Sequence, residues 1–82
     1  MEKNCNIFCV TYEDNTKDNL MVFGEEIDKK EMKHHIFQHL KETNGEVYDN
    51  DELKEAADNI IHGCTWYNGG DEYYLETSTL FE

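Results

Sequence analysis

Apolar and polar positions along this chain follow two periods, one typical of strands and one typical of helices. Residues 5–13 are rich in β-branched and aromatic types, and residues 20–23 repeat this composition. The two runs predict β-strands joined by a polar turn at residues 14–19. Apolar residues lie on both alternating faces of the first strand, as Cys5 and Phe8 illustrate. We therefore expect this strand to occupy the middle of a sheet.

The chain then changes to the helical period. Asp28 and Glu31 have the spacing of a capping box, which predicts the start of a helix. The apolar positions that follow recur at helical spacing: Met32, Ile36, Phe37 and Leu40. Asn44 and Gly45 supply the stop signal for this first helix.

A second helix is predicted directly afterwards. Asp49 and Glu52 repeat the capping spacing, and Gly63 marks the end. Between them the apolar residues form one stripe: Leu53, Ala56, Ala57, Ile60 and Ile61. The stripe predicts that this helix packs one face against a core.

Two more β-rich runs complete the chain, at residues 64–67 and 73–80. Asn68-Gly69-Gly70-Asp71 lies between them and predicts a hairpin turn. The order ββααββ predicts a single α+β domain over residues 1–82. We expect a four-stranded, mainly antiparallel sheet with two helices on one face. The other face of the sheet is then free for solvent or a partner.

Charge changes this picture of an ordinary small domain. The chain has 82 residues with 19 acidic side chains and seven lysines, no arginine, and a net charge of −12. Such self-repulsion lowers stability, and a cationic partner would offset it. Nucleic acid and anionic lipid are disfavoured as direct ligands because both are polyanions. Intrinsic disorder is the alternative for an acidic chain, but ten aromatic residues argue for a folded core.

The acidic residues are densest on the second predicted helix. Asp51, Glu55 and Asp58 have i, i+4, i+7 spacing, which places them on one exposed face opposite the apolar stripe. Their carboxylates then recur about every 5–6 Å. An array of this kind can imitate the phosphates of a nucleic-acid strand. The alternative is a solvated helix face that keeps the protein in solution.

The predicted binding residues come from this helix, the loop before it and the last hairpin. Aromatic residues of the hairpin would act as interface anchors, where Trp and Tyr are enriched. The alternative is that they form the hairpin core through cross-strand pairs. The full set is Glu46, Asp49, Asp51, Glu52, Glu55, Asp58, Asp71, Glu72, Trp66 and Tyr67.

Metal-ligating residues occur, but not with a recognised spacing. His35 and His39 have the i, i+4 spacing that can hold one metal ion on a helix. The other candidate ligands are Cys5, Cys9, His62 and Cys64. No Cys-x-x-Cys is present, and the glutamate of the zincin helix motif is missing. We therefore expect core thiols and histidines at a helix edge, with no metal and no other cofactor.

Catalytic motifs are also absent from the sequence. A Cys-His dyad from His62 and Cys64 would need both residues on one face of a strand, and no oxyanion hole accompanies it. We expect a protein that is not an enzyme. The odd number of cysteines, three, and the lack of a signal peptide or membrane span favour the cytoplasm.

In size, charge and layout the chain resembles small acidic inhibitors encoded by phages, including anti-CRISPR proteins and other DNA mimics. The resemblance implies a non-catalytic inhibitor that occupies the nucleic-acid site of a basic host protein. The second interpretation is an immunity-type or regulatory module that binds a basic partner without mimicking DNA, with or without a structural zinc. Either protein would be a monomer or a homodimer.

Overall fold

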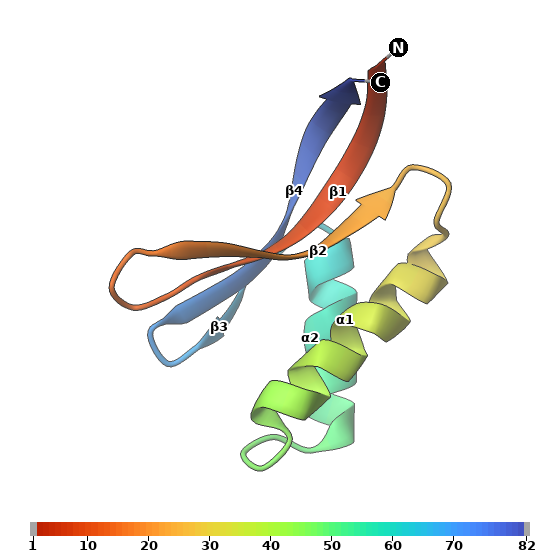
Figure 1. The fold of residues 1–82 in the computed structure, drawn as a ribbon. Coiled ribbons are helices and arrows are strands. Elements are labelled where there is room, and N and C mark those ends of the chain that lie inside the picture. Colours follow the sequence, from red (N-terminus) through yellow and green to blue (C-terminus); the bar gives the residue numbers. More distant parts are fainter. Residues whose placement is uncertain (1, 82) are drawn as a thin grey trace.

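The computed structural model describes the backbone of residues 2–81 and the side chains of residues 4–77. It has an α+β fold in the predicted order ββααββ (Figure 1). The elements are β1 (Glu2–Thr11), β2 (Lys17–Gly24), α1 (Lys29–Asn44), α2 (Asn50–Ile61), β3 (Trp66–Asn68) and β4 (Asp71–Phe81).

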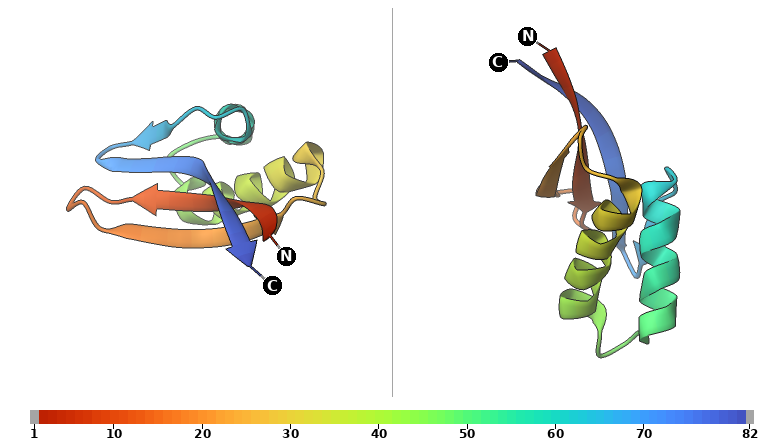
Figure 2. Two further views of the ribbon diagram at one scale, coloured as in Figure 1. Left: turned by 90° about the horizontal axis from the view of Figure 1, so that it is seen from above. Right: turned by 90° about the vertical axis from the view of Figure 1, so that its right-hand side faces the viewer.

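The four strands form one antiparallel sheet in the order β2-β1-β4-β3. Both helices cover the same face of this sheet, as the side view of Figure 2 shows. The predicted fold class is therefore confirmed. The central position of β1 is confirmed as well, since it pairs with β2 on one side and β4 on the other.

Several predicted strand boundaries are wrong, including the start of β1 at Glu2 and of β4 at Asp71, and three others have a clear physical reason. β2 begins at Lys17, inside the segment predicted as a turn, because an edge strand tolerates polar side chains on its open face. β1 ends at Thr11 because the backbone turns at Tyr12, whose N–H donates to the carbonyl of Thr16. β3 begins at Trp66 because the chain first closes the end of α2.

An irregularity in β2 keeps its apolar residues over the core. Phe8 pairs with Met21 and Cys9 with Asn19, so Leu20 is an extra residue in β2. A bulge of this kind reverses the alternation of side chains beyond it. Lys17 and Asn19 therefore lie on the open face, while Met21 and Leu20 pack against the core.

The core lies between the sheet and the helices. Its fully buried members come from β1, α1 and α2: Phe8, Val10, Ile36, Leu40, Leu53, Ala57 and Ile60. Both predicted N-caps are confirmed: Asp28 accepts a hydrogen bond from the N–H of Glu31 and Asp49 from that of Glu52. In the described part of the chain, neither helix combines the length and apolarity that crossing a bilayer requires.

Candidate functional site

The acidic face of α2 is directed outward because the opposite face is buried. Leu53 and Ile60 are fully buried, so Asp51, Glu55 and Asp58 lie on the outer side of the helix. We call these three residues the acid ridge. Asp51 and Glu55 are exposed, and the side chain of Asp58 retains 48% of its accessible surface. The predicted array of carboxylates is therefore present on a helix.

The carboxylates of α2 differ in whether a cation neutralises them. Asp58 lies 3.3 Å from Nζ of Lys33 and 3.8 Å from Nδ1 of His62. Among the described side chains, no lysine or histidine nitrogen lies within 4.0 Å of the carboxylates of Asp51, Glu52 or Glu55. The N-terminal half of α2 thus presents uncompensated negative charge. The positive end of the helix dipole stabilises the residues of the first turn.

A hollow lies beside this charge, between α2 and β3. Its volume is about 230 Å³, and its lining residues are Tyr48, Glu52, Glu55, Ala56, Asn59 and Trp66. We call it the Trp66 hollow. It joins two carboxylates to aromatic surface, a combination that suits the ammonium or guanidinium group of a Lys or Arg side chain.

A row of aromatic contacts fixes Trp66. Its ring centroid lies 5.3 Å from that of Tyr48, edge to face, and 5.6 Å from that of Tyr73. Tyr73 stacks in turn on the buried Phe8, with 6.0 Å between ring centroids. Trp66 is therefore half-buried hairpin core on one side and the wall of the hollow on the other. The hairpin-core interpretation of Trp66 therefore holds, and its role as an interface anchor stays a prediction.

A polar network holds the loop between α1 and α2 against β3. The hydroxyl of Tyr48 donates to Oδ1 of Asn68 at 3.1 Å, and Nδ2 of Asn68 donates to Oδ1 of Asn44. Asn44 is 8% exposed and belongs to the last turn of α1. Sequence reasoning missed Tyr48, Asn44 and Asn68. A tyrosine directly before the cap of α2 and two asparagines beside glycines were the available signals.

The loop before α2 carries two further predicted residues. Asp49 is the N-cap, so one of its carboxylate oxygens is already bonded within the chain, at 2.9 Å from the N–H of Glu52. Glu46 is exposed next to Val47, which retains 77% of its accessible surface. Of these two acidic residues, Glu46 is the one whose carboxylate makes no described hydrogen bond.

The acidic hairpin turn does not join the acid ridge. The tips of the β1–β2 and β3–β4 hairpins lie together and project away from the helices (Figures 1 and 2). Asp71 accepts a hydrogen bond from the N–H of Glu13 at 3.2 Å. Gly70 packs so closely on Glu13 that an added Cβ would lie 2.7 Å from its side chain. Asp71 therefore holds two hairpins together.

Tyr67 and Trp66 face opposite sides of the sheet. Tyr67 pairs with Glu72 on the face away from the helices and is 63% exposed, whereas Trp66 pairs with Tyr73 on the helix side. The structure thus brings Trp66 together with Glu52 and Glu55 but places Tyr67 and Glu72 elsewhere. A flat partner surface that contacts α2 could therefore also contact Trp66, but it could not reach Tyr67.

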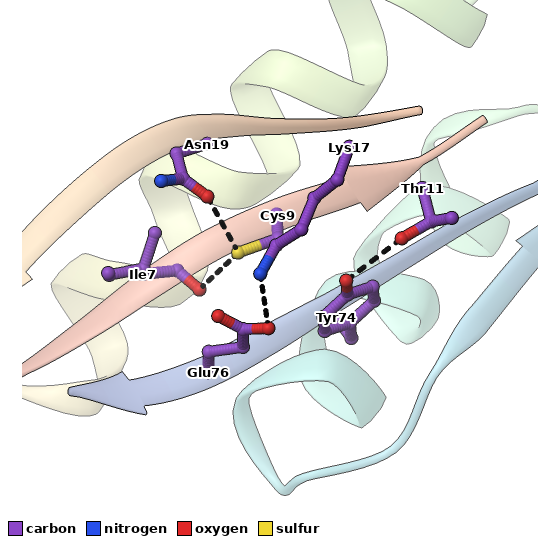
Figure 3. Close-up of polar contacts among 7 residues, drawn as sticks. All are labelled: Ile7, Cys9, Thr11, Lys17, Asn19, Tyr74 and Glu76. Atoms are coloured by element: carbon purple, nitrogen blue, oxygen red, sulfur yellow. Dashed lines mark hydrogen bonds and ion pairs between the residues drawn. The ribbon is translucent and has the colours of Figure 1, made fainter. Parts of the chain in front are cut away.

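On the face of the sheet away from the helices, polar side chains make contacts around and above Cys9 (Figure 3). Lys17 on β2 and Glu76 on β4 form an ion pair across β1, with 2.5 Å between Nζ and Oε1. The Cys9 thiol is fully buried beneath them, with Sγ 3.4 Å from the carbonyl of Ile7 and from Oδ1 of Asn19. Burial, and secondarily the charge of Glu76, raises the pKa of Cys9. The thiol is therefore held protonated and screened.

The candidate metal ligands are dispersed. His35 lies against Phe23 and His39 against Phe8, so both helix histidines make aromatic contacts. His62 and Cys64 do not meet the condition for a dyad on one strand face, because this segment closes α2: the N–H of Cys64 donates to the carbonyl of Asn59. Among the side chains of residues 4–77, no three His, Cys, Asp or Glu residues form a group that could hold a metal ion.

Comparison with known proteins adds no relative to this description. Neither a protein-family model, nor a curated protein, nor a solved structure matches the chain.

Proposed function

We propose that this protein is a non-catalytic inhibitor of a basic nucleic-acid-binding protein, such as a CRISPR effector or another host defence nuclease. The acidic face of α2 would enter the groove that normally holds nucleic acid. Its carboxylates would pair with lysine and arginine side chains there, and one of these cations would enter the Trp66 hollow. Opposite charge would also speed the encounter of the two proteins.

One observation carries this proposal. Among the side chains of residues 4–77, the carboxylates of Asp51, Glu52 and Glu55 have no cationic partner, and they lie on a helix whose other face is buried. Glu52 and Glu55 also line a hollow with an aromatic wall. The helix fixes the backbone positions from which these carboxylates project, so binding need not order the backbone, and more of the electrostatic attraction is kept as affinity. A solvated helix face explains the charge but gives no reason for the adjoining hollow.

An immunity-type module that binds a basic partner without imitating DNA is the second candidate. Lys33 and Lys54 favour it, because they place positive charge along the side of α2 that faces α1. A nucleic-acid strand has no such positive edge. Competition separates the two candidates: a mimic is displaced from its target by DNA or RNA, whereas an immunity-type partner need not be.

Affinity capture from the native host tests the proposal. The immobilised protein is expected to retain a nucleic-acid-binding protein, identified by mass spectrometry, and added DNA or RNA should release it. The variant Glu52→Gln/Glu55→Gln removes two charges with little change in side-chain size. We expect it to bind the same target about tenfold or more weakly, since desolvated charge pairs contribute more than 1.4 kcal/mol each.

The matched control is Glu25→Gln/Glu26→Gln. It removes the same charge from exposed positions in the turn between β2 and α1. This variant should bind within about twofold of wild type, as expected for charges outside an interface. Equal losses in the two variants would mean that net charge, and not the face of α2, determines binding. Capture of no nucleic-acid-handling protein at low ionic strength would end the proposal.

A further inference from the structure

Positive charge gathers on one surface of this acidic protein. Three of the seven lysines line a single hollow between α1 and α2: Lys30, Lys33 and Lys54. His34 and Phe37 complete its lining, and its volume is about 280 Å³. The two helices lie side by side here (Figure 2). We call this site the Phe37 hollow.

Helical spacing brings the lysines to the aromatic ring. Lys30, Lys33, His34 and Phe37 have i, i+3, i+4, i+7 spacing on α1, so they share one face of that helix. Lys54 reaches the hollow from α2, with Nζ 5.9 Å from the centroid of the Phe37 ring. Phe37 is half-buried and packs against the core. The hollow therefore has a fixed apolar wall and a cationic rim.

Among the described side chains, two of these lysines have no acidic partner, although acidic residues outnumber lysines 19 to seven in the sequence. Lys33 is bonded to Asp58. Within the part of the chain whose side chains are described, no carboxylate oxygen lies within 4.0 Å of Nζ of Lys30 or Lys54. Ammonium groups left unpaired beside an apolar wall provide a site for an anion that also carries an apolar group.

We propose that the Phe37 hollow binds an acidic segment of a partner protein, in which carboxylates flank an apolar side chain. The apolar side chain contacts Phe37 and the aliphatic parts of the lysines, and the carboxylates pair with Lys30 and Lys54. The volume is slightly below that of a typical small-molecule pocket, which suits a single side chain with its neighbours.

Charge favours a short segment over the other anionic occupants. A nucleic acid or a second copy of this chain would bring many negative charges toward a protein of net charge −12, and long-range repulsion opposes both. A segment with one or two carboxylates gains the local contacts with little of that repulsion. The inference is independent of the inhibitor proposal, because Glu52 and Glu55 do not line this hollow.

Titration with short peptides, followed by amide chemical shifts, tests the inference. The probe is the blocked peptide Asp-Leu-Phe-Glu, and its neutral counterpart is Asn-Leu-Phe-Gln. We expect the acidic peptide to shift the amides of Lys30, His34, Phe37 and Lys54. The Kd should be about tenfold or more larger for the neutral peptide, and also for the Lys30→Glu/Lys54→Glu variant with the acidic peptide. In both cases two charge pairs are lost.

A variant with the same charge change elsewhere is the control. Lys29→Glu/Lys41→Glu alters exposed lysines of α1 outside the hollow and should bind the acidic peptide like wild type. The inference is overturned if the amides lining the hollow do not shift, or if the neutral peptide binds equally well. It is also overturned if a short oligothymidylate shifts the same amides more strongly, since the surface would then be a nucleic-acid site.

Discussion

The ammonium group of Lys33 donates to Oδ1 of Asp58 across 3.3 Å and so links α1 to the acid ridge of α2. The pair lies between the Phe37 hollow, which Lys33 lines, and the N-terminal half of α2, whose carboxylates have no cationic partner among the described side chains. Asp58 is therefore the member of the ridge that is least available to a partner.

Replacing Asp58 with Asn should lower stability only slightly. Both side chains keep more than a third of their accessible surface, so the ion pair contributes less than about 1 kcal/mol. Urea unfolding measures the change. The same variant frees Lys33, so it should bind the acidic peptide at least as tightly as wild type. A loss of peptide binding in a folded Asp58→Asn protein would contradict this account of the boundary.

Replacing the N-cap of α2 should have a larger effect. Asp49→Ala removes the hydrogen bond to the N–H of Glu52 and should lower the free energy of unfolding by about 1 kcal/mol. Asp51→Ala, two residues after the cap and exposed, should lower it by only a few tenths of that amount, through the lost interaction with the helix dipole. Equal losses in chemical denaturation would show that charge alone, and not the cap, stabilises this end of α2.

The ion pair over Cys9 should control the reactivity of that thiol. In a Cys64→Ser background, which removes the exposed cysteine, Glu76→Gln should speed alkylation of Cys9 by about tenfold or more. The substitution opens the cover and removes a charge that raises the pKa of the thiol. Mass spectrometry of iodoacetamide-treated protein measures the rate. The control is Glu72→Gln, which lies on the same strand but pairs with Thr11 and not with Cys9. It should leave the alkylation rate of Cys9 unchanged.

His39 should make the fold less stable in acid. Burial lowers the pKa of His39 below its ordinary value of 6.5, with a smaller opposing effect from Glu42. The unfolded chain therefore binds a proton near pH 6.5 that the folded chain binds only at lower pH. In that interval the unfolded state carries more protons, so this contribution to stability falls as the pH drops below 6.5.

The variant His39→Gln lacks this titrating group. Comparing it with wild type separates the contribution of His39 from that of the many carboxylates. The difference in unfolding free energy between this variant and wild type should shift in favour of the variant as the pH is lowered from about 7.5 to about 5.5. This is the range in which an ordinary histidine titrates. The change measured for His34→Gln, at an exposed position, is the baseline. A relative stability of the His39 variant that does not vary with pH would contradict the assignment.

Salt should stabilise this protein. The net charge of −12 makes the folded state repel itself, and screening weakens that repulsion. The Tm should rise by several degrees between low salt and about 1 M sodium chloride, where the Debye length is about 3 Å. A Tm that falls with salt would mean that ion pairs such as Lys17–Glu76 outweigh the repulsion.

The sequence predicts the order and packing of the elements because local signals agree with the global pattern. Asp28 and Asp49 cap helices in the structure as their spacing indicates, and the turn at Gly69 adopts a φ of +63° that favours glycine. The start of β2 was not predictable in this way. Its polar residues, Lys17 and Asn19, are strand residues only because β2 lies at the edge of the sheet.

The candidate site was predictable on α2 and not beyond it. Helical period alone places Asp51 and Glu55 on one outer face. The Trp66 hollow depends on where β3 docks beside α2, which follows from long-range contacts such as that between Tyr48 and Asn68. The bonding of Asp71 to a distant hairpin has the same origin. No local pattern reveals such contacts.

The pairing of β1 with β4 has a consequence for folding. Glu2 pairs with Phe81 and Thr11 with Glu72, so the middle of the sheet joins the first strand of the chain to the last. Closing such long loops costs entropy before the contacts are gained, which slows folding relative to a helical domain of the same size. The first hairpin therefore leaves the inner edge of β1 unpaired until β4 docks beside it.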